Sequence, residues 1–208
     1  MKRKSKHRPR VSGRRLKKDI EGVLGYISEA GMLKRVARSG WSVAGIKCAE
    51  SVADHSFRCA VIGYALSRME HADPYKVLLM TLFGDMQESR ITDLHKMAQR
   101  YIDPEEAEIL SFSDQVRALP VKIRKELTAT RAEYNSQDTD ESVIARDADI
   151  LECLIQAKEY FEQGHKDASH LMKKAPRFLR SLSARRLWRE AKRARLSDWW
   201  SLLGVFKR

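Results

Sequence analysis

Three short segments place acidic and imidazole side chains inside otherwise apolar, helix-forming sequence. The side chains are His55 in the first segment, Asp85, Glu88 and Asp93 in the second, and Asp149 in the third. Buried carboxylates and imidazoles are costly unless they are paired or bind a metal. An imidazole and carboxylates can hold a divalent cation while a neighbouring acid handles a proton. This residue set therefore indicates metal-dependent hydrolysis of a phosphate ester.

Each of these residues, taken singly, also has a purely structural explanation. Asp85 could cap a helix, Glu88 could be solvated, and His55 could be a hydrogen-bonded core histidine. Asp85 and Glu88 are three residues apart, which puts them on one face if the segment is helical. Asp93 lies just beyond them in the sequence. The combination, rather than any single residue, favours a site.

The elements that must position these side chains are expected to be helices. The chain has five prolines and ten glycines in 208 residues and few alternating β-branched runs, which predicts an all-α bundle. The expected helices are 16–38 (one or two, with a break at Gly31), 53–69, 73–88, a helix that starts at Asp103-Pro104, 121–134 and 141–162, followed by basic helices after Gly164. Residues 39–52 and 135–139 are expected to be loops.

Two of these helices allow a prediction of their buried face. The 53–69 helix is expected to bury Phe57, Ala60, Val61, Tyr64 and Ala65. In the basic stretch 182–195, aromatic and aliphatic side chains alternate with arginines. Binding to nucleic acid or to an anionic membrane is one interpretation, and packing of Leu187 and Trp188 on the bundle is the favoured one. Trp199-Trp200 is expected to dock the chain end on the domain or to lie in a homodimer contact.

Charge is distributed unevenly along the chain. Residues 1–18 hold ten Lys/Arg and no acid, and residues 173–208 hold twelve Lys/Arg and two acids. The segment between them holds 18 bases and 26 acids, a net charge of −8, although the whole chain is +12. We expect a disordered basic tail (1–15), one domain (16–172) and a basic helical extension packed on it (173–208). The basic ends could contact polyanions without sequence preference, or could simply be solvated.

Cysteine usage and hydropathy bear on the compartment. The three cysteines have no CxxC spacing and are expected to be buried, reduced thiols of a cytoplasmic protein. The longest apolar run, about 77–83, is too short to span a bilayer. The basic N-terminus is not followed by the apolar core of a signal peptide.

With these residues in view, the chain resembles the HD-domain metal-dependent phosphohydrolases, most closely the 5′-deoxynucleotidase-like members. The similar region runs from Leu33 to Tyr160, and its most specific segments are 33–41, 50–55, 85–88 with Asp93 further on, and 149–152. The resemblance implies an all-α fold that binds one divalent metal ion.

The resemblance also implies a role for individual residues. His55, Asp85 and Asp149 correspond to metal ligands. Glu88 corresponds to the residue that handles the water or the leaving-group proton, and Asp93 to the acid near the attacked phosphate. Arg38, assisted by Arg35, corresponds to the phosphate-binding position, and Trp41 to the sugar-facing one.

Gly84 departs from the pattern that the resemblance implies. The family has a histidine ligand at this position, and glycine supplies no ligand atom. The chain could be a variant inactivated by substitution, a natural pseudoenzyme, or a protein in which water or His95 replaces the ligand. In the first two cases we expect reduced metal affinity. Nothing in the local sequence requires a glycine here, and inside a helix it costs about 1 kcal/mol relative to alanine.

The sequence favours one metal ion rather than two. His95 is the only histidine between Asp85 and Asp149, whereas dinuclear relatives need more in that interval. One histidine and two carboxylates suit Mn²⁺, Co²⁺, Fe²⁺ or Zn²⁺.

The predicted function is hydrolysis of (deoxy)nucleoside 5′-monophosphates, with the substrate nucleotide as the main partner. One alternative is a non-catalytic nucleotide- or nucleic-acid-binding protein, which Gly84 favours. Another is an HD-domain hydrolase of nucleoside di- or triphosphates or of signalling nucleotides.

Overall fold

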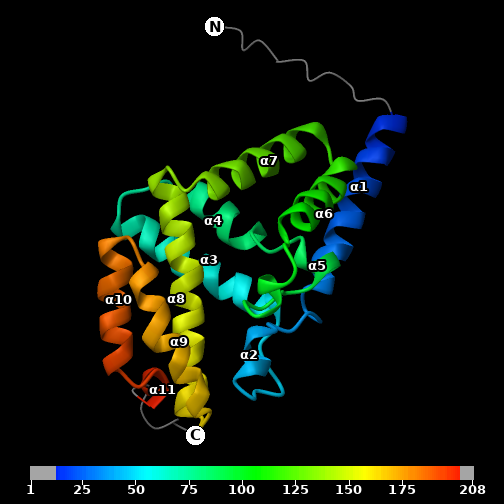
Figure 1. Cartoon of the computed structure of the whole chain (residues 1–208). Coiled ribbons are helices and arrows are strands. Elements are labelled where there is room, and N and C mark those ends of the chain that lie inside the picture. Colours follow the sequence, from blue (N-terminus) through cyan, green and yellow to red (C-terminus); the bar gives the residue numbers. More distant parts are fainter. Residues whose placement is uncertain (1–12, 202–208) are drawn as a thin grey trace, which may run out of the picture.

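The structure, a computed structural model, describes residues 13–201, and within this range the secondary structure is helical, without a β-strand. One isolated antiparallel bridge joins Ala37 to Ser51. The helices, shown in Figure 1, are α1 Gly13–Met32, α2 Gly40–Val43, α3 Val52–Met69, α4 Pro74–Phe83, α5 Glu88–Ile91, α6 Glu105–Arg117, α7 Val121–Ser136, α8 Asp140–Glu162, α9 Ser169–Lys174, α10 Leu182–Arg193 and α11 Asp198–Ser201. Short 3₁₀ turns occupy Ala98–Arg100, Lys166–Ala168 and Ala175–Phe178. The all-α prediction is confirmed.

Helix α8 forms the centre of the main core. It packs against α3 and α4 on one side and against α9 and α10 on another, as Figure 1 shows. Leu66 of α3, Val77 of α4, Leu151 of α8 and Ala184 of α10 are all fully buried in this cluster. A separate cluster of Val116, Leu119 and Leu127 joins α6 to α7. The long central helix therefore holds the site-bearing segments in fixed positions.

Polar residues at the helix starts explain where several of these helices begin. Ser51 and Asp54 form a reciprocal capping box at the start of α3. The Asp73 side chain accepts from the Tyr75 N–H, and Pro74 occupies the first turn of α4, as expected from the sequence. Asp54, although it precedes His55, is therefore a capping residue rather than a part of the site.

Three predicted boundaries are wrong. Helix α1 continues through Gly31 and ends at Met32, so this glycine does not break it. The 39–52 segment contains the short helix α2. The helix expected over 73–88 ends at Phe83, where it is followed by bonds of i→i−3 type from Met86 to Phe83 and from Glu88 to Asp85.

The predicted buried face of α3 is also wrong. Phe57, Val61 and Tyr64 are more than half exposed, and Ala65 is exposed, whereas Ala60 is buried as expected. The helix instead turns His55, Cys59, Ile62 and Leu66 toward α4 and α8. Both faces of this helix carry apolar residues, and only contact with the neighbouring helices decides which face is covered.

The C-terminal helices follow the prediction in part. Trp188 is buried and Leu187 packs on the core, as expected. Trp199 and Trp200 remain 68% and 59% exposed, so the expectation that they dock on the domain is wrong for the described part of the chain.

Other expectations concern the cysteines, the chain ends and the membrane. Cys48 is exposed, which corrects the expectation that every cysteine is buried. Most of the predicted disordered tail falls in residues 1–12, outside the described range, and α1 begins at Gly13. Within residues 13–201, no helix is long and apolar enough to cross a membrane.

Candidate metal and phosphate site

His55 is the centre of the candidate site. It lies in the first turns of α3 and is almost fully buried. Its Nε2 atom lies 3.5 Å from Oδ2 of Asp85 and 3.2 Å from Oδ1 of Asp149. The structure therefore brings the three predicted metal ligands together from α3, from the turn after α4 and from α8.

Glu152, itself bound by Arg58, fixes the imidazole of His55 on its Nδ1 side. Nδ1 of His55 contacts Oε2 of Glu152, which is completely buried. Arg58 donates from Nε and Nη2 to Oε1 of Glu152 at 2.9 and 2.8 Å, and from Nη1 to Glu159 at 2.8 Å. A carboxylate on one ring nitrogen fixes the direction of the other, which is the usual support of a metal-binding histidine.

Glu152 and Arg58 are not among the site residues predicted from the sequence. Arg58 follows His55 by three residues and Glu152 follows Asp149 by three, so each shares a helix face with a predicted ligand. That spacing was the available signal for both residues.

The electrostatic environment of His55 favours its protonated form. Burial alone lowers the pKa of His55, but hydrogen bonds to Asp149 and Glu152 raise it well above the usual range. Burial raises the pKa of Asp149, whereas His55, Arg38 and Arg146 outweigh this effect and lower it. The protonated imidazole of His55 supplies one positive charge between the carboxylates. A metal cation could take the place of this proton once the ring is deprotonated.

The donor types of His55, Asp85 and Asp149 suit a divalent cation. Two ligand atoms, each about 2.1 Å from one ion and about 90–110° apart, are separated by roughly 3.0–3.4 Å. The two distances from Nε2 of His55, 3.2 and 3.5 Å, are close to this range. The two aspartates would have to approach each other to share one ion with His55, because among the described residues only His55, Glu152 and Cys153 have ligand atoms that all lie within 4.8 Å of one another.

A second close trio involves Cys153. One ligand atom each of His55, Glu152 and Cys153 lie within 4.8 Å of one another. However, Glu152 is already bound by Arg58, and the Cys153 sulfur accepts from Nη2 of Arg38 at 3.3 Å. These contacts leave the Nε2 side of the imidazole as the side on which a cation could bind.

Residues 84–88 form the side of the site that carries Asp85 and Glu88. Because α4 ends at Phe83, Asp85 lies in the turn 84–87 and Glu88 begins the short helix α5. The two acids are therefore not on one helix, which corrects the prediction. Gln115 donates to the Met86 carbonyl at 2.9 Å, and Arg131 donates to Oε1 of Gln87 at 3.0 Å. Contacts from α6 and α7 therefore help to hold this turn.

Gly84 faces a small cavity beside the predicted ligands. The cavity, about 10 Å³, is lined by His55, Cys59, Asp85 and Asp149, among others. Such a space is about the size needed for one water molecule. A Cβ atom at Gly84 would lie 2.8 Å from the Met80 carbonyl oxygen. The expectation that nothing local requires glycine is thus corrected, because the backbone passes too close for an unstrained side chain.

Glu88 is an acid of the site with incomplete hydrogen bonding. Its Oε2 atom is buried without a hydrogen-bond partner among the described residues. Burial raises the pKa of Glu88 to about 9, assisted by the charges of Asp85 and Asp93. A carboxyl group in this state can hold a proton and offers an oxygen to water or substrate.

Arg38 lies beside Asp85, and Asp93 is bound by the backbone of the next residue, Ser39. Nη1 of Arg38 lies 3.9 Å from Oδ2 of Asp85, and the Ser39 N–H donates to Asp93 at 2.7 Å. Burial alone lowers the pKa of Arg38, but Cys153 and the nearby aspartates raise it well above the usual range. Arg38 therefore presents a permanent cation beside the ligand cluster.

Trp41 and Arg35 occupy different surroundings from those expected. Trp41 is buried, packs edge-on against Tyr160 and donates from Nε1 to Glu50 at 2.9 Å. Arg35 is exposed and makes none of the contacts that join the other site residues. Their roles in sugar and phosphate binding stay predictions.

His95 is engaged away from the ligand cluster. Its Nδ1 atom accepts from the Ala98 N–H at 3.1 Å and so caps the turn that follows. This contact gives His95 a local structural role. It does not support His95 as the replacement for the missing ligand.

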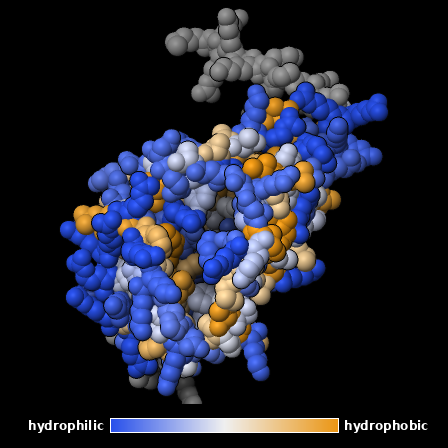
Figure 2. All heavy atoms as spheres, viewed as in Figure 1, coloured by the Kyte–Doolittle hydropathy of each residue, from blue (hydrophilic) through white to orange (hydrophobic). Residues whose placement is uncertain are grey.

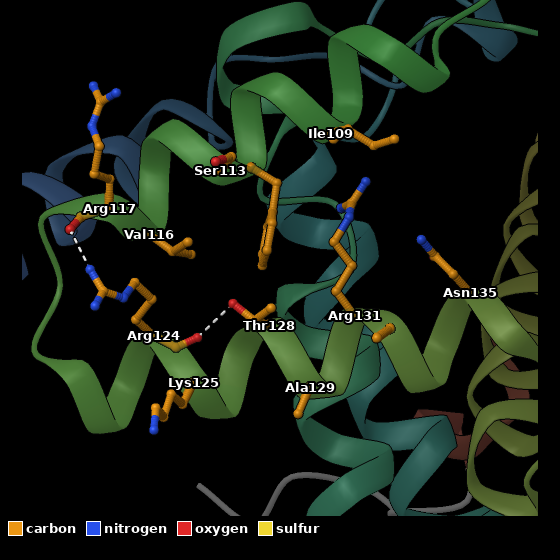
Figure 3. A pocket seen from close by; sticks show the side chains of 12 residues that line it. Ile109, Ser113, Val116, Arg117, Arg124, Lys125, Thr128, Ala129, Arg131 and Asn135 are labelled. Atoms are coloured by element: carbon orange, nitrogen blue, oxygen red, sulfur yellow. Dashed lines mark hydrogen bonds between the residues drawn. The ribbon is translucent and has the colours of Figure 1, made fainter.

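A groove of about 740 Å³ lies elsewhere, between α6 and α7. Figure 3 shows Val116 and Thr128 pointing into the space between the two helices, and Arg117 and Arg124 near the loop that joins them. The groove contains none of the predicted site residues. Arg131 connects the groove to the site, because its guanidinium lies over the Phe112 ring and also donates to Gln87.

Comparisons with known proteins agree with this arrangement. The HD domain family matches residues 30–187. The 5′-deoxynucleotidase HDDC2 of Dictyostelium discoideum is 29% identical over 155 residues, which cover 70% of this chain and 81% of the relative. The human protein of the same name is 29% identical over 149 residues, which cover 69% and 71%.

A solved structure shares the fold. A conserved hypothetical protein from Pyrococcus furiosus has a TM-score of 0.67 and 34% identity, and the alignment covers 82% of this chain and 99% of that one. The family match covers most of the bundle, including the three segments that bring His55, Asp85 and Asp149 together. The resemblance predicted from sequence is confirmed, and the chain belongs to the HD-domain family.

Proposed function

We propose that this chain is an HD-domain phosphohydrolase scaffold whose substrate class is (deoxy)nucleoside 5′-monophosphates. The observation that carries the proposal is the convergence of Asp85 and Asp149 on Nε2 of His55, with Arg38 beside them. The substrate class is supported by the names of the relatives, which are 5′-deoxynucleotidases.

Arg38, Glu88 and Asp93 would each have a different role in the reaction. Arg38 would bind phosphate oxygens through its guanidinium, which suits phosphate geometry. Glu88 would hold or donate a proton at the oxygen that leaves, from a carboxyl oxygen that has no hydrogen-bond partner within residues 13–201. Asp93, fixed by the Ser39 N–H, would orient the group that attacks.

One divalent ion, Mn²⁺, Co²⁺, Fe²⁺ or Zn²⁺, would be held by His55, Asp85 and Asp149. When bound, it would act as a Lewis acid toward a phosphoryl oxygen and make water a better nucleophile. We propose a cytoplasmic location as well, as the sequence predicted.

Gly84 supports a second candidate function. Without an imidazole at this position the protein supplies three ligands, and a chain that binds a nucleotide without hydrolysing it would need no fourth. The remaining acids argue for hydrolysis, because Asp85, Glu88 and Asp93 next to a bound phosphate would weaken simple binding through charge repulsion.

The test compares the chain with Gly84→His and Gly84→Ala. Phosphate release is measured with deoxynucleoside mono-, di- and triphosphates and with Mn²⁺ or Co²⁺, and metal content is measured on the same samples. Both variants carry the Cβ contact with Met80, so alanine is the control for the backbone shift.

We expect Gly84→His to bind the metal about 10- to 100-fold more tightly, since groups outside the ligand shell already change metal affinity by such factors. Turnover by the histidine variant alone would identify this chain as a disabled nucleotidase. Turnover by all three proteins would mean that another group completes the site. No turnover by any of them, with equal metal content, would contradict the proposal and leave nucleotide binding without hydrolysis.

A further inference from the structure

The groove between α6 and α7 is lined by apolar side chains from both helices. On α6, Ile109, Phe112 and Val116 recur at spacings of three and four residues, so they share one face of the helix. On α7, Ala129 and Ala132 line the other wall. The groove therefore lies between two apolar helix faces.

This apolar surface is open to solvent. The two helices share the small cluster of Val116, Leu119 and Leu127, but Ile109 remains 56% exposed. Figure 2 shows hydrophobic side chains beside hydrophilic ones over the region where Figure 1 draws α6. Covering such a surface with an apolar ligand would be favourable, because the surface is then removed from water.

The charge on the groove is of one sign. Four of the twelve lining residues are cations and none is an acid; the cations are Arg117, Arg124, Lys125 and Arg131. The segment 19–172 holds 18 bases and 26 acids, so this concentration of positive charge is local. The acids of α7 contact α4 instead, where Glu126 accepts from the Tyr75 hydroxyl at 2.8 Å and Glu133 from Lys76 at 3.1 Å. The groove therefore favours an anionic ligand.

Arg124 is a cation of the groove without an acidic partner. Arg117 pairs with Asp114 at 2.9 Å, and Arg131 pairs with Glu108 at 3.2 Å. Arg124 donates to the Arg117 carbonyl at 3.1 Å, and within residues 13–201 no acid lies within ion-pair distance of it. It lies in the first turn of α7, which contains no acid and carries the positive end of the helix dipole.

The size and the lining of the groove define the class of ligand. Its volume of about 740 Å³ lies within the roughly 300–1,000 Å³ of small-molecule sites. Figure 3 shows the Arg124 guanidinium directed toward α6, whereas Lys125 is directed away from it. One such cation beside apolar walls suits a ligand with one anionic group on an apolar body. A polyphosphate would leave most of its charges without a partner, and a neutral lipid would make no use of Arg124.

We propose that the groove between α6 and α7 binds an amphipathic organic monoanion, of which a medium-chain carboxylate is the simplest representative. The anionic group binds Arg124 through charge-assisted hydrogen bonds. The apolar body lies between Phe112 and Val116 of α6 and Ala129 of α7, and its burial supplies the remaining affinity. The site is independent of the proposed hydrolysis, because none of the predicted site residues lines the groove.

The test titrates the full chain with hexanoate, octanoate and decanoate below their micelle concentrations, and with octanol as the neutral probe. Isothermal titration calorimetry gives the affinity and the number of sites. Arg124→Gln removes the charge but keeps a donor for the Arg117 carbonyl, and its control is Arg186→Gln at an exposed position of α10. Ala129→Phe fills the groove, and its control is Ala107→Phe at an exposed position of α6 outside the groove.

We expect one site, with an affinity that rises by up to about fourfold for each methylene that enters the groove. Octanol should bind more weakly than octanoate. Arg124→Gln should weaken octanoate binding by at least about tenfold, because a hydrogen bond to a charged group is lost. Ala129→Phe should abolish binding, and both control variants should bind as the wild type does. Circular dichroism checks that each variant is folded.

Four results would overturn the proposal. One is absence of decanoate binding by the wild type. The second is equal binding of octanol and octanoate, which would remove the role of the anionic group. The third is an equal loss in Arg124→Gln and Arg186→Gln, which would indicate attraction by total charge alone. The fourth is unchanged binding in Ala129→Phe, which would place the ligand at other exposed apolar side chains, such as Leu24 or Phe57.

Discussion

On the α3–α8 side of the site, His55, Glu152 and Arg58 form a continuous chain of hydrogen bonds, whereas at residues 84–88 Oε2 of Glu88 has no partner in the part of the chain that the structure describes. The first side lies between two long helices that share the main core. The second side is a turn that depends on side chains reaching from α6 and α7. Gly84, at the position where the resemblance implies a histidine, lies on this second side.

The difference shows where the site keeps its structure and where it can vary. A buried carboxylate with two cationic partners is costly to alter, because any single change leaves an unpaired charge. Residues 84–88, beside the small cavity, contain an acid with incomplete hydrogen bonding, Glu88. Loss of a side chain there costs little structural stability. The absence of a ligand at Gly84 therefore falls in the half of the site that tolerates it.

Removing Glu152 should have the largest effect on stability. Glu152→Ala leaves the buried His55 and the partly buried Arg58 without their shared partner, so we expect the free energy of unfolding to fall by roughly 3–5 kcal/mol. Urea denaturation measures the change. The control is Glu159→Ala, which removes the partly exposed contact of Arg58 and should cost about 1 kcal/mol or less. Equal losses would show that the buried contacts of Glu152 contribute no more to the free energy of unfolding than the partly exposed contact of Glu159.

Arg131 tests whether the turn is held from outside the site. Arg131→Ala removes the bond to Gln87, the residue before Glu88, so we expect kcat to fall by up to about 100-fold through misplacement of the turn. Metal affinity should stay unchanged, since the ligands are not touched. Arg131→Lys should recover part of the loss.

The measurement for Arg131 uses whichever protein, the Gly84 chain or Gly84→His, hydrolyses nucleotide. Arg124→Ala is the matched control, because Arg124 lines the same groove and donates to the Arg117 carbonyl instead of the turn. A similar fall in kcat for Arg124→Ala would refute the specific role of Arg131.

Ionisation of Glu88 should be visible as a dependence of stability on pH. Burial raises the pKa of Glu88 from 4.5 to about 9, with Asp85 and Asp93 adding to the rise and Arg38 and His55 opposing it. Between these values the folded state binds more protons than the unfolded state, so stability contributed by Glu88 is lost as pH rises toward 9.

Glu88→Gln keeps the shape of the side chain but cannot ionise. In metal-free protein, we expect the urea midpoint of the wild type to fall more than that of Glu88→Gln between about pH 6 and pH 9. The other titrating groups are present in both proteins, so the difference reports Glu88. Parallel pH profiles would mean that Glu88 is ionised in the folded protein at neutral pH.

Much of the site could be predicted from residue types and spacing. Residue types together with the resemblance indicate His55, Asp85 and Asp149, which the structure brings next to one another with Arg38 beside them. Glu152 and Arg58 are not indicated in this way, because a helix spacing of three is common on solvated faces as well. Arg131 and Gln115 could not be predicted, since their partners are 44 and 29 residues away in the sequence.

The sequence by itself determined the helical class, the helix start at Asp73, the family and the set of chemical groups. These properties depend on local periodicity, on capping residues and on side-chain chemistry. Only the tertiary structure decided that α3 buries His55 and exposes Phe57, and that α4 ends at Phe83. It also decided that a side chain at Gly84 would meet the Met80 carbonyl. These outcomes depend on which helix faces meet and how closely the backbones approach, and such contacts join residues that are far apart along the chain.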